Sequence, residues 1–379
     1  MKHIFLCRNM YFTATTFKIL KFTKRKRSLC RLICSNPSLP NFKKVGRREN
    51  RNASSWRVMF FGSDDFSLGT LTRLNDEMRT TKTVSKLEVV TSKWHLNPVR
   101  LFGQQNSLVT HEWPIDVHLT KGFDIGVVAS FGHMIPKEVI DSFPLGMLNV
   151  HGSLLPRWRG AAPVNYAIMH GDKITGISIM RIQPHAFDVG EVISKKEVQI
   201  HSKEMAPQLR KRLSEIGGEE IISCIRKLPT CLENAEPQLD YGVTYAPKLT
   251  SDVGHINFEK MNAKCIYNRY RGLFGMVPLM TSWNGLRLTL HDVSECDNSN
   301  TENQLLIGIN TVKNSSQPAP STPGQVFYDK KSKALVIRCI ENSFLIVRRV
   351  APHRRKPMSA LEFYNGYMSK QDKAKWMFI

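Results

Sequence analysis

Apolar runs and amphipathic stretches alternate along the first two thirds of the chain. Runs rich in β-branched and aromatic residues predict strands over residues 56–62, 86–91, 123–130 and 147–151. Apolar residues at helical spacing predict helices over residues 66–74, 137–143 and 203–228. Ser63 or Asp64 can cap the first of these helices. Because strands and helices alternate, this part is expected to form a parallel sheet covered by helices on both faces.

The pattern changes after a Pro- and Glu-bearing linker at residues 228–240. Alternating or β-branched segments then predict strands over residues 285–290, 324–328, 334–339 and 344–350. The longest break between them, residues 296–323, is rich in Asn, Ser, Thr and Pro and predicts a mobile loop. We therefore expect two domains, residues 56–240 and residues 250–379, the second a small β-barrel.

The net charge of +22 is unevenly distributed. Residues 1–48 contain 13 Lys or Arg and no Asp or Glu, with several Ser and Thr, and residues 11–22 can form an amphipathic helix. Such a segment is typical of a mitochondrial transit peptide, and the alternative is a basic tail that binds RNA nonspecifically. We expect residues 1–50 to be a transit peptide outside the fold, and the protein to act in the mitochondrial matrix.

Membrane and metal functions find no support in the sequence. No apolar run approaches the roughly 20 residues that a spanning helix needs. The eight cysteines contain no C-x-x-C pair and have no histidine partners at metal-ligand spacing; they are Cys7, Cys30, Cys34, Cys224, Cys231, Cys265, Cys296 and Cys339. We therefore expect no membrane association, no metal and no disulfide framework.

The most informative stretch begins in the fourth predicted strand and continues through residue 163. Side chains two apart in a strand face the same way, so Asn149 and His151 project together. The strand then ends in a Gly- and Pro-containing loop, at the edge where open α/β folds bind ligands. An Asn amide can donate to an oxygen that gains negative charge, and a His can take or deliver a proton near neutral pH.

A carboxylate is what this pair lacks, and Asp188 in Phe187-Asp188-Val189-Gly190-Glu191 is a candidate. It could orient the imidazole or hold a water molecule. On spacing alone, Asn149 can equally be an ordinary edge residue and Asp188 an ordinary turn residue.

Several motifs in order carry a resemblance. They are Phe61-Gly62-Ser63-Asp64-Asp65-Phe66, Val127 to Gly132, Asn149 to Pro163, Gly176 to Met180, Phe187 to Ile193, Tyr245 to Leu249 and Lys356 to Ala360. Together they resemble the formyltransferase superfamily that uses 10-formyltetrahydrofolate. The form Ser153-Leu154-Leu155-Pro156-Arg157-Trp158-Arg159-Gly160 is similar to the members that formylate methionyl-tRNA. The resemblance covers residue 56 to the C-terminus.

The resemblance implies a fold, a reaction and a set of site residues. The fold is a Rossmann-like formyltransferase domain followed by an OB-like β-barrel that binds tRNA. The reaction passes a formyl group from 10-formyltetrahydrofolate to charged initiator methionyl-tRNA, without a metal, in a monomer. The catalytic set falls on Asn149, His151 and Asp188. Folate contacts fall on Val128, Ala129, Ser130, Phe131, Gly132, Ser153, Leu154, Leu155 and Pro156.

Residues 250–379 carry 18 basic against 10 acidic residues, which suits a surface that binds phosphates. Its candidate tRNA contacts are Arg269, Arg271, Arg354, Arg355 and Lys356. Simple solubility of a small β-domain is the alternative. Phe274, Pro278 and Trp283 are expected in the core, and structural roles are expected for Trp94, His133, His170 and His185.

Two departures from the family pattern stand out. The family often has Thr-Pro where Ser63-Asp64 stands, and bacterial members carry a longer basic loop where residues 91–100 are short.

The rival interpretations are a sister enzyme that formylates a nucleotide-linked amine or a glycinamide ribotide, a nicotinamide dehydrogenase, and a noncatalytic RNA-binding protein. Against the dehydrogenase, the G-x-G-x-x-G motif that binds nicotinamide dinucleotides is absent after the first predicted strand of this chain.

Overall fold

The computed structural model describes residues 55–93, 97–296 and 322–379. The predicted transit peptide, the residue Trp94 and nearly all of the predicted loop at residues 296–323 lie outside these ranges. Within the described ranges, no helix is both long and apolar enough to cross a membrane.

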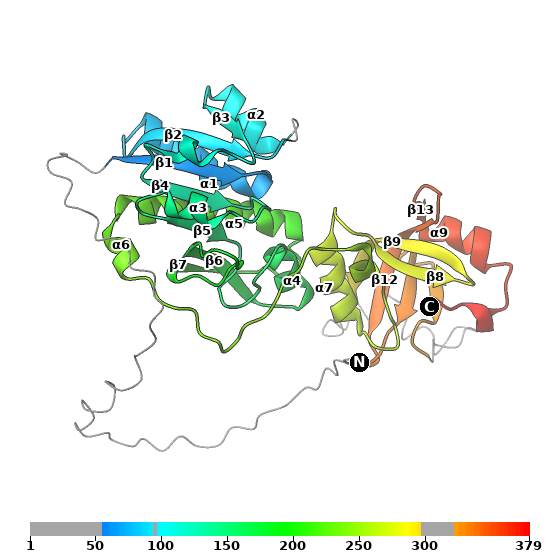
Figure 1. Ribbon diagram of the computed structural model, residues 1–379. Helices are drawn as coiled ribbons and strands as arrows, with labels where there is room; N and C mark the ends of the chain where they lie inside the picture. Colours follow the sequence, from blue (N-terminus) through cyan, green and yellow to red (C-terminus); the bar gives the residue numbers. More distant parts are fainter. Residues whose placement is uncertain (1–54, 94–96, 297–321) are drawn as a thin grey trace, which may run out of the picture. The chain divides into compact units, whose positions relative to one another are not determined.

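The first part of the chain forms a seven-stranded sheet in the order β3-β2-β1-β4-β5-β6-β7 (Figure 1). Its strands are β1 (Trp56–Gly62), β2 (Val84–Thr91), β3 (Thr110–Glu112), β4 (Ile125–Ala129), β5 (Met147–His151), β6 (Ile174–Arg181) and β7 (Val192–Gln199). The first five strands are parallel, as expected. β6 runs antiparallel to β5, and β7 antiparallel to β6, so the sheet is mixed rather than wholly parallel.

Helices cover both faces of this sheet, so alternate residues of β1 lie in two different cores. Val58 and Phe60 belong to the core beneath α1 (Asp65–Arg79) and α5 (Ala206–Arg226). Met59 and Phe61 belong to the core beneath α3 (Lys137–Asp141). The remaining helices of this part are α2 (Pro98–Gln105), α4 (Pro163–Met169), α6 (Thr230–Glu233) and the 3-10 helix η1 (Val117–Thr120).

The beginning of α1 is fixed by the predicted cap. The Asp64 side chain accepts hydrogen bonds from the backbone N–H groups of Phe66, at 3.0 Å, and Ser67, at 3.3 Å. These bonds satisfy two of the amides that the first turn of a helix leaves without intrahelical partners. The cap places Asp64 directly after β1, at the carboxyl edge of the sheet.

The second part of the chain forms an antiparallel sheet in the order β10-β11-β12-β9-β8, with β13 paired to β12. Its strands are β8 (Leu279–Trp283), β9 (Leu286–Glu295), β10 (Val326–Asp329), β11 (Ala334–Arg338), β12 (Phe344–Pro352) and β13 (Met358–Ser359). Its helices are α7 (Ala263–Leu273), α9 (Ala360–Phe363), η2 (Ser251–Gly254), η4 (Tyr364–Met368) and η5 (Lys373–Lys375).

The C-terminal segment joins the two edge strands of this sheet. Ser282 and Ile379 exchange backbone hydrogen bonds at 2.9 and 3.0 Å on the β8 side. On the β10 side, Phe378 donates to Gly324 and Val326 donates to Trp376, at 2.9 and 3.0 Å. The segment therefore bridges the two edge strands in the manner of a small barrel and covers part of each edge.

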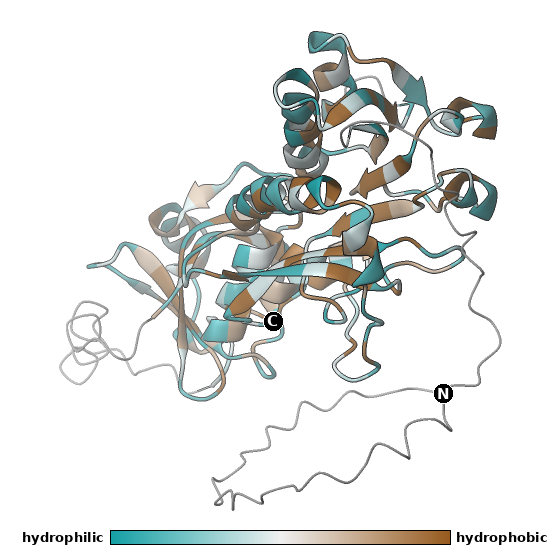
Figure 2. Cartoon of the chain, turned by 90° about the vertical axis from the view of Figure 1, so that its left-hand side faces the viewer, coloured by the Kyte–Doolittle hydropathy of each residue, from teal (hydrophilic) through white to brown (hydrophobic). Residues whose placement is uncertain are grey.

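The hydropathy colouring shows apolar residues along the strands and a mixture of apolar and hydrophilic residues on the helices (Figure 2). Trp283 is 2% exposed and packs in the core of the second sheet, as predicted. The same prediction is wrong for Phe274, which is 43% exposed, and for Pro278, which is also exposed. Both follow α7 in the turn that leads to β8, where the chain runs over the surface.

Candidate active site at the carboxyl edge of the first sheet

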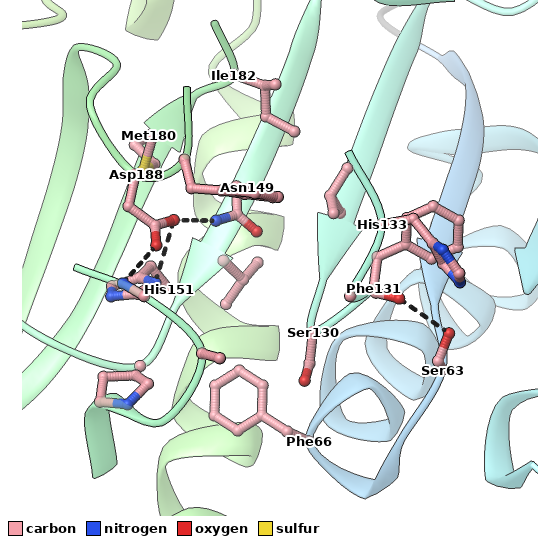
Figure 3. Close-up of a pocket in the computed structure, with 18 of the residues that line it drawn as sticks. Ser63, Phe66, Ser130, Phe131, His133, Asn149, His151, Met180, Ile182 and Asp188 are labelled. Atoms are coloured by element: carbon pink, nitrogen blue, oxygen red, sulfur yellow. Dashed lines mark hydrogen bonds and ion pairs between the residues drawn. The ribbon is translucent and has the colours of Figure 1, made fainter. Parts of the chain in front are cut away.

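A pocket of about 580 Å³ opens at the carboxyl ends of β1, β4 and β5 (Figure 3). A volume of this size lies within the range of small-molecule sites. The walls are largely apolar, and a few polar groups converge on them. Residues that line the pocket include Asp64, Phe66, Val128, Ser130, Phe131, His133, Asn149, His151, Met180, Ile182, Asp188 and Arg210.

Asn149 and His151 reach the pocket from one strand, β5. β5 lies between β4 and β6, so that Asn149 pairs with Val128 on one side and with Met180 on the other. The strand is buried on both faces except at Asn149, which is half-buried. Period-two alternation therefore brings an amide and an imidazole to the same wall, as the sequence predicts.

Asp188 comes from the connection between β6 and β7 and completes the group. Figure 3 shows the side chains of Asn149, His151 and Asp188 turned toward one another. The Asn149 Nδ2 group donates to Asp188 Oδ1 at 3.3 Å, and the same oxygen lies 3.4 Å from His151 Nδ1. Three residues from two distant segments thus meet around one carboxylate.

The other oxygen of Asp188 is held by a backbone amide. The Gly160 N–H donates to Asp188 Oδ2 at 2.8 Å. Asp188 has φ +55°, a left-handed conformation that residues with a Cβ rarely adopt. Gln238 stabilises this turn, because its Nε2 group donates to the Asp188 and Gly190 carbonyls at 2.9 and 2.8 Å. Hydrogen bonds to the carboxylate oxygens and to the backbone of the turn therefore hold Asp188 in place.

The second nitrogen of the His151 ring faces a carbonyl group. Nε2 lies 2.9 Å from the Trp158 oxygen, and the imidazole is only 6% exposed. A carbonyl can only accept a hydrogen bond, so this contact requires the hydrogen on Nε2. Nδ1 is then the nitrogen that can exchange a proton with Asp188 or with a bound substrate.

Glycine is required where the loop carrying Gly160 passes the following segment. Gly160 has φ +122°, and a Cβ there would lie 2.6 Å from the Ala246 carbonyl oxygen. A side chain at this position would push the loop away from Ala246 and move the amide that binds Asp188.

The rim of the pocket holds two polar residues, Asp64 and Arg210, that sequence reasoning missed as site residues. Arg210 of α5 is ion-paired with Asp64, and the Ser130 hydroxyl donates to the same carboxylate at 2.6 Å. The Arg210 guanidinium also lies 5.4 Å from the centre of the Phe66 ring. Asp64 could be recognised as a helix cap, but nothing in the sequence places Arg210, 146 residues away, beside it.

His133 is a further lining residue for which only a structural role was predicted. It is exposed and lies 5.0 Å, centre to centre, from the Phe131 ring. His170 and His185 do not line the pocket. His170 packs against Trp158 with ring centres 4.7 Å apart, and His185 is exposed at φ +63°.

The residues expected to contact folate divide into two groups. Val128, Ser130, Phe131 and Gly132 line the pocket, where the chain turns at the end of β4. Ala129 is fully buried on the opposite side of that strand. The pocket lining does not include Ser153, Leu154, Leu155 or Pro156. Ser153 is fully buried and its hydroxyl donates to the Arg157 carbonyl at 2.6 Å, so it is turned away from a ligand in this pocket.

The residues expected to contact tRNA also divide. Arg354, Arg355 and Lys356 are exposed in the turn between β12 and β13. Arg269 is half-buried and donates to the His255 carbonyl at 2.9 Å. Burial lowers the pKa of both Arg269 and Arg271 below the ordinary value of an arginine.

The expectation that Arg271 contacts tRNA requires correction. Arg271 is 4% exposed, and its guanidinium donates to the Glu204 carbonyl at 2.8 Å and to Asn268 Oδ1 at 2.7 Å. A buried guanidinium with these partners is not presented to a phosphate. The rotation of successive residues along α7 turns Arg271 inward, a direction that the sequence motif does not reveal.

Comparison with known proteins assigns this architecture to a class. Residues 56–225 match the family model described as formyl transferase, and residues 248–368 match the model described as the formyl transferase C-terminal domain. The two matches fall on the two sheets described above. The chain therefore has the fold and the two-part organisation of a formyl transferase.

The similarity to individual proteins is more specific. The mitochondrial methionyl-tRNA formyltransferase of Bos taurus is 37% identical over 350 residues, which cover 91% of this chain and 85% of that protein. The Homo sapiens protein of the same name is 37% identical over 84% of this chain and 79% of its own length. This chain belongs to the methionyl-tRNA formyltransferase family.

Solved structures agree in fold. An N-formyltransferase from Helicobacter canadensis, in complex with folinic acid and dTDP-3-aminofucose, superposes with a TM-score of 0.54 at 14% identity, covering 77% of this chain and 98% of its own. HypX from Aquifex aeolicus, in complex with tetrahydrofolic acid, gives a TM-score of 0.51 at 13% identity, covering 83% of this chain and 48% of its own. Formyl transferases of this fold thus include proteins that bind tetrahydrofolate derivatives.

Proposed function

We propose that this protein transfers the formyl group of 10-formyltetrahydrofolate to the α-amino group of methionyl-tRNA, with Asn149, His151 and Asp188 as its catalytic residues. The observation that carries the proposal is the convergence of these three side chains on the wall of one pocket. Membership of the methionyl-tRNA formyltransferase family supports the choice of donor and acceptor.

The pocket suits a folate by its shape and lining. Its volume of about 580 Å³ accommodates a flat heterocycle, and Val128, Phe131 and Ile182 supply apolar walls. Ser130 has φ +45° and Gly132 has φ +77°, so the backbone turns sharply after β4 and presents polar groups to the pocket. We assign the folate ring to this strand end. When bound, 10-formyltetrahydrofolate would supply the formyl group as an activated N-formyl amide.

Asn149 is assigned to the formyl oxygen. That oxygen gains negative charge as the amine attacks, and the charge needs a donor that is already in place. The Asn149 amide carries two hydrogens; one is directed to Asp188, and the other can be donated into the pocket. Removing one such donor typically lowers the rate about 10²- to 10³-fold.

His151 and Asp188 are assigned to proton movement. The attacking α-amine must lose one proton as its new bond to carbon forms, and the departing nitrogen must gain one as its bond to carbon breaks. Asp188 can accept the first proton, and His151 Nδ1, 3.4 Å from Asp188 Oδ1, can pass it on. Because Trp158 and Gly160 hold the outer atoms of this pair, the reacting atoms keep a fixed orientation.

The tRNA is assigned to the second domain. Arg354, Arg355 and Lys356 form an exposed basic turn that can neutralise backbone phosphates. Arg269 stays in the proposal as a half-buried neighbour, and Arg271 does not. For localisation we propose the mitochondrial matrix, because the first 48 residues carry 13 basic and no acidic residues, and because the relatives from Bos taurus and Homo sapiens are mitochondrial proteins.

The test is formyl transfer with a choice of acceptors. Purified protein would be incubated with 10-formyltetrahydrofolate and, in separate reactions, with charged initiator methionyl-tRNA, glycinamide ribotide and a nucleotide-linked amino sugar. The proposal predicts transfer to methionyl-tRNA alone. Transfer to either small amine, with none to methionyl-tRNA, would overturn it.

A further inference from the structure

The orientation of His151 depends on a residue outside the pocket. Its Nε2 donates to the Trp158 carbonyl at 2.9 Å, and Trp158 is not among the residues that line the cavity. The Trp158 side chain is 5% exposed, so it is packed inside the protein rather than presented to a substrate. The direction of this carbonyl therefore fixes the Nε2 side of the imidazole, opposite the contact of Nδ1 with Asp188.

Trp158 holds that direction in a backbone conformation that needs support. Its φ is +63°, in the left-handed region that residues with a Cβ rarely occupy. Two hydrogen bonds fix it there: the backbone N–H donates to Thr244 Oγ1 at 2.9 Å, and the indole Nε1 donates to Asp172 Oδ2 at 2.8 Å. One bond holds the main chain of Trp158, and the other holds its side chain.

Asp172 is itself anchored by Arg157, the residue that precedes Trp158. Arg157 donates two parallel hydrogen bonds to Asp172 from one edge of its guanidinium, from Nη2 to Oδ1 at 2.6 Å and from Nε to Oδ2 at 2.8 Å. A bidentate pair of this kind fixes orientation as well as position. The guanidinium also lies 4.4 Å from the centre of the Trp158 ring. We call Arg157, Trp158, Asp172 and Thr244 the Trp158 clamp.

The loop that the Trp158 clamp holds contacts both proposed proton-transfer residues. Two residues after Trp158, the Gly160 N–H donates to Asp188 Oδ2 at 2.8 Å. A shift of this loop would therefore move the hydrogen-bond partners of His151 and of Asp188 together. None of the four clamp residues lines the pocket, so they reach the groups inside it through these contacts.

We propose that Asp172 is a positioning residue for formyl transfer, which holds Trp158 so that its carbonyl orients the His151 ring. The inference rests on the proposed function for its kinetic consequence, but its structural consequence is measurable without any substrate. If Asp172 served stability alone, removing its side chain would lower the free energy of unfolding by the same amount as under our proposal. The orientation of the His151 ring would then stay unchanged. The two are separated by observing the ring itself.

The kinetic experiment compares Asp172→Ala and Asp172→Asn with a matched pair elsewhere. Asp124 is 4% exposed and accepts bonds from Arg57 at 2.9 and 3.1 Å, and neither residue lines the pocket. Asp124→Ala therefore removes a similar pair without touching the loop. We expect Asp172→Ala to lower kcat about 10- to 100-fold, with the KM of both substrates changed by less than about twofold. Asp172→Asn keeps an oxygen for the indole and should lose less activity.

The spectroscopic experiment follows the ring nitrogens of His151 by NMR in protein labelled with ¹⁵N-histidine, with His151→Ala used for assignment. We expect the Nε2 resonance of His151 to shift in Asp172→Ala and to stay in place in Asp124→Ala. An unchanged resonance, or a kcat per folded molecule equal to that of Asp124→Ala, would overturn the inference. If the wild-type protein transferred no formyl group to methionyl-tRNA, the proposed function would fail, and the resonance would still decide this point.

Discussion

The exposed His170 packs one side of its ring against Trp158, with ring centres 4.7 Å apart. Burial lowers the pKa of His170 from its ordinary value of 6.5; Asp172 opposes this shift, and Arg157 and Arg269 add to it. The unfolded chain therefore binds a proton at this residue more readily than the folded protein does. Stability from the neutral ring is present above pH 6.5 and is lost as the pH falls through the lowered pKa.

We predict that His170→Phe, which keeps an aromatic ring against Trp158, weakens this dependence. The free energy of unfolding would be measured by denaturant titration at about pH 8 and at about pH 5.5 for both proteins. The loss of stability on acidification should be smaller in the variant than in the wild type. An equal loss in both proteins would mean that the His170 proton is not linked to folding.

How far single residues could be predicted depends on what places them. Asn149 and His151 follow from strand alternation alone, because both sit in one strand. Asp188 lies 39 residues beyond Asn149; the sequence offered it as a candidate carboxylate, but only the family resemblance favoured it over an ordinary turn residue. Arg210 was missed because its pairing with Asp64 depends on how α5 packs over the sheet. These long-range contacts leave no local trace in the sequence.

Helices α1 and α5 pack closely because each contributes glycine to the contact. A Cβ on Gly218 would lie 2.5 Å from the Gly69 carbonyl oxygen, and a Cβ on Gly69 would lie 2.1 Å from the Ser214 carbonyl oxygen. Both obstacles are main-chain atoms, which cannot turn aside as a flexible side chain can. The spacing of these two helices is thus set by the absence of side chains at two positions.

We predict that Gly218→Ala lowers the free energy of unfolding by about 1–3 kcal/mol, since added volume must push two packed helices apart. The control is Gly366→Ala, because a Cβ at Gly366 would meet no atom within 4 Å. That control should change stability by less than about 1 kcal/mol. Denaturant titration of both variants measures the difference. Equal effects would show that the helix contact tolerates a methyl group.

The elements themselves were largely predictable where a local pattern was strong. The strand at Met147–His151 was predicted at its exact bounds, and α1, α3 and α5 lie where helical spacing placed them. β6 and β7 were not predicted as strands, and the sheet was expected to be parallel. Strand direction depends on which neighbour a strand pairs with, and the hydrophobic pattern of one strand does not encode that choice.

On the scale of the whole molecule, excess positive charge is confined to the chain ends, and an exposed basic turn lies at Arg354, Arg355 and Lys356. The charge count alone could not separate these residues from the buried Arg271 of the same domain. Net charge is read from composition, but the presentation of each charge depends on tertiary packing.

We predict that changing Arg354 and Arg355 together to Ala makes the salt dependence of tRNA binding shallower, by about 0.7–0.9 in slope for each phosphate that is no longer neutralised. The control changes Lys195 and Lys196 of β7 to Ala, which removes the same charge from exposed positions in the first domain. Binding would be titrated at several salt concentrations. A slope that changes equally in both variants would show a general charge effect and no binding surface at the turn.

The most direct test of the catalytic assignment is the single-turnover rate of formyl transfer to charged initiator methionyl-tRNA by His151→Ala. The exposed His118→Ala serves as control, and circular dichroism and tRNA affinity show that each variant is folded and binds its substrate. We expect a loss of at least about 10²-fold for His151→Ala and a near-normal rate for His118→Ala. A near-normal rate in folded, tRNA-binding His151→Ala would contradict the assignment.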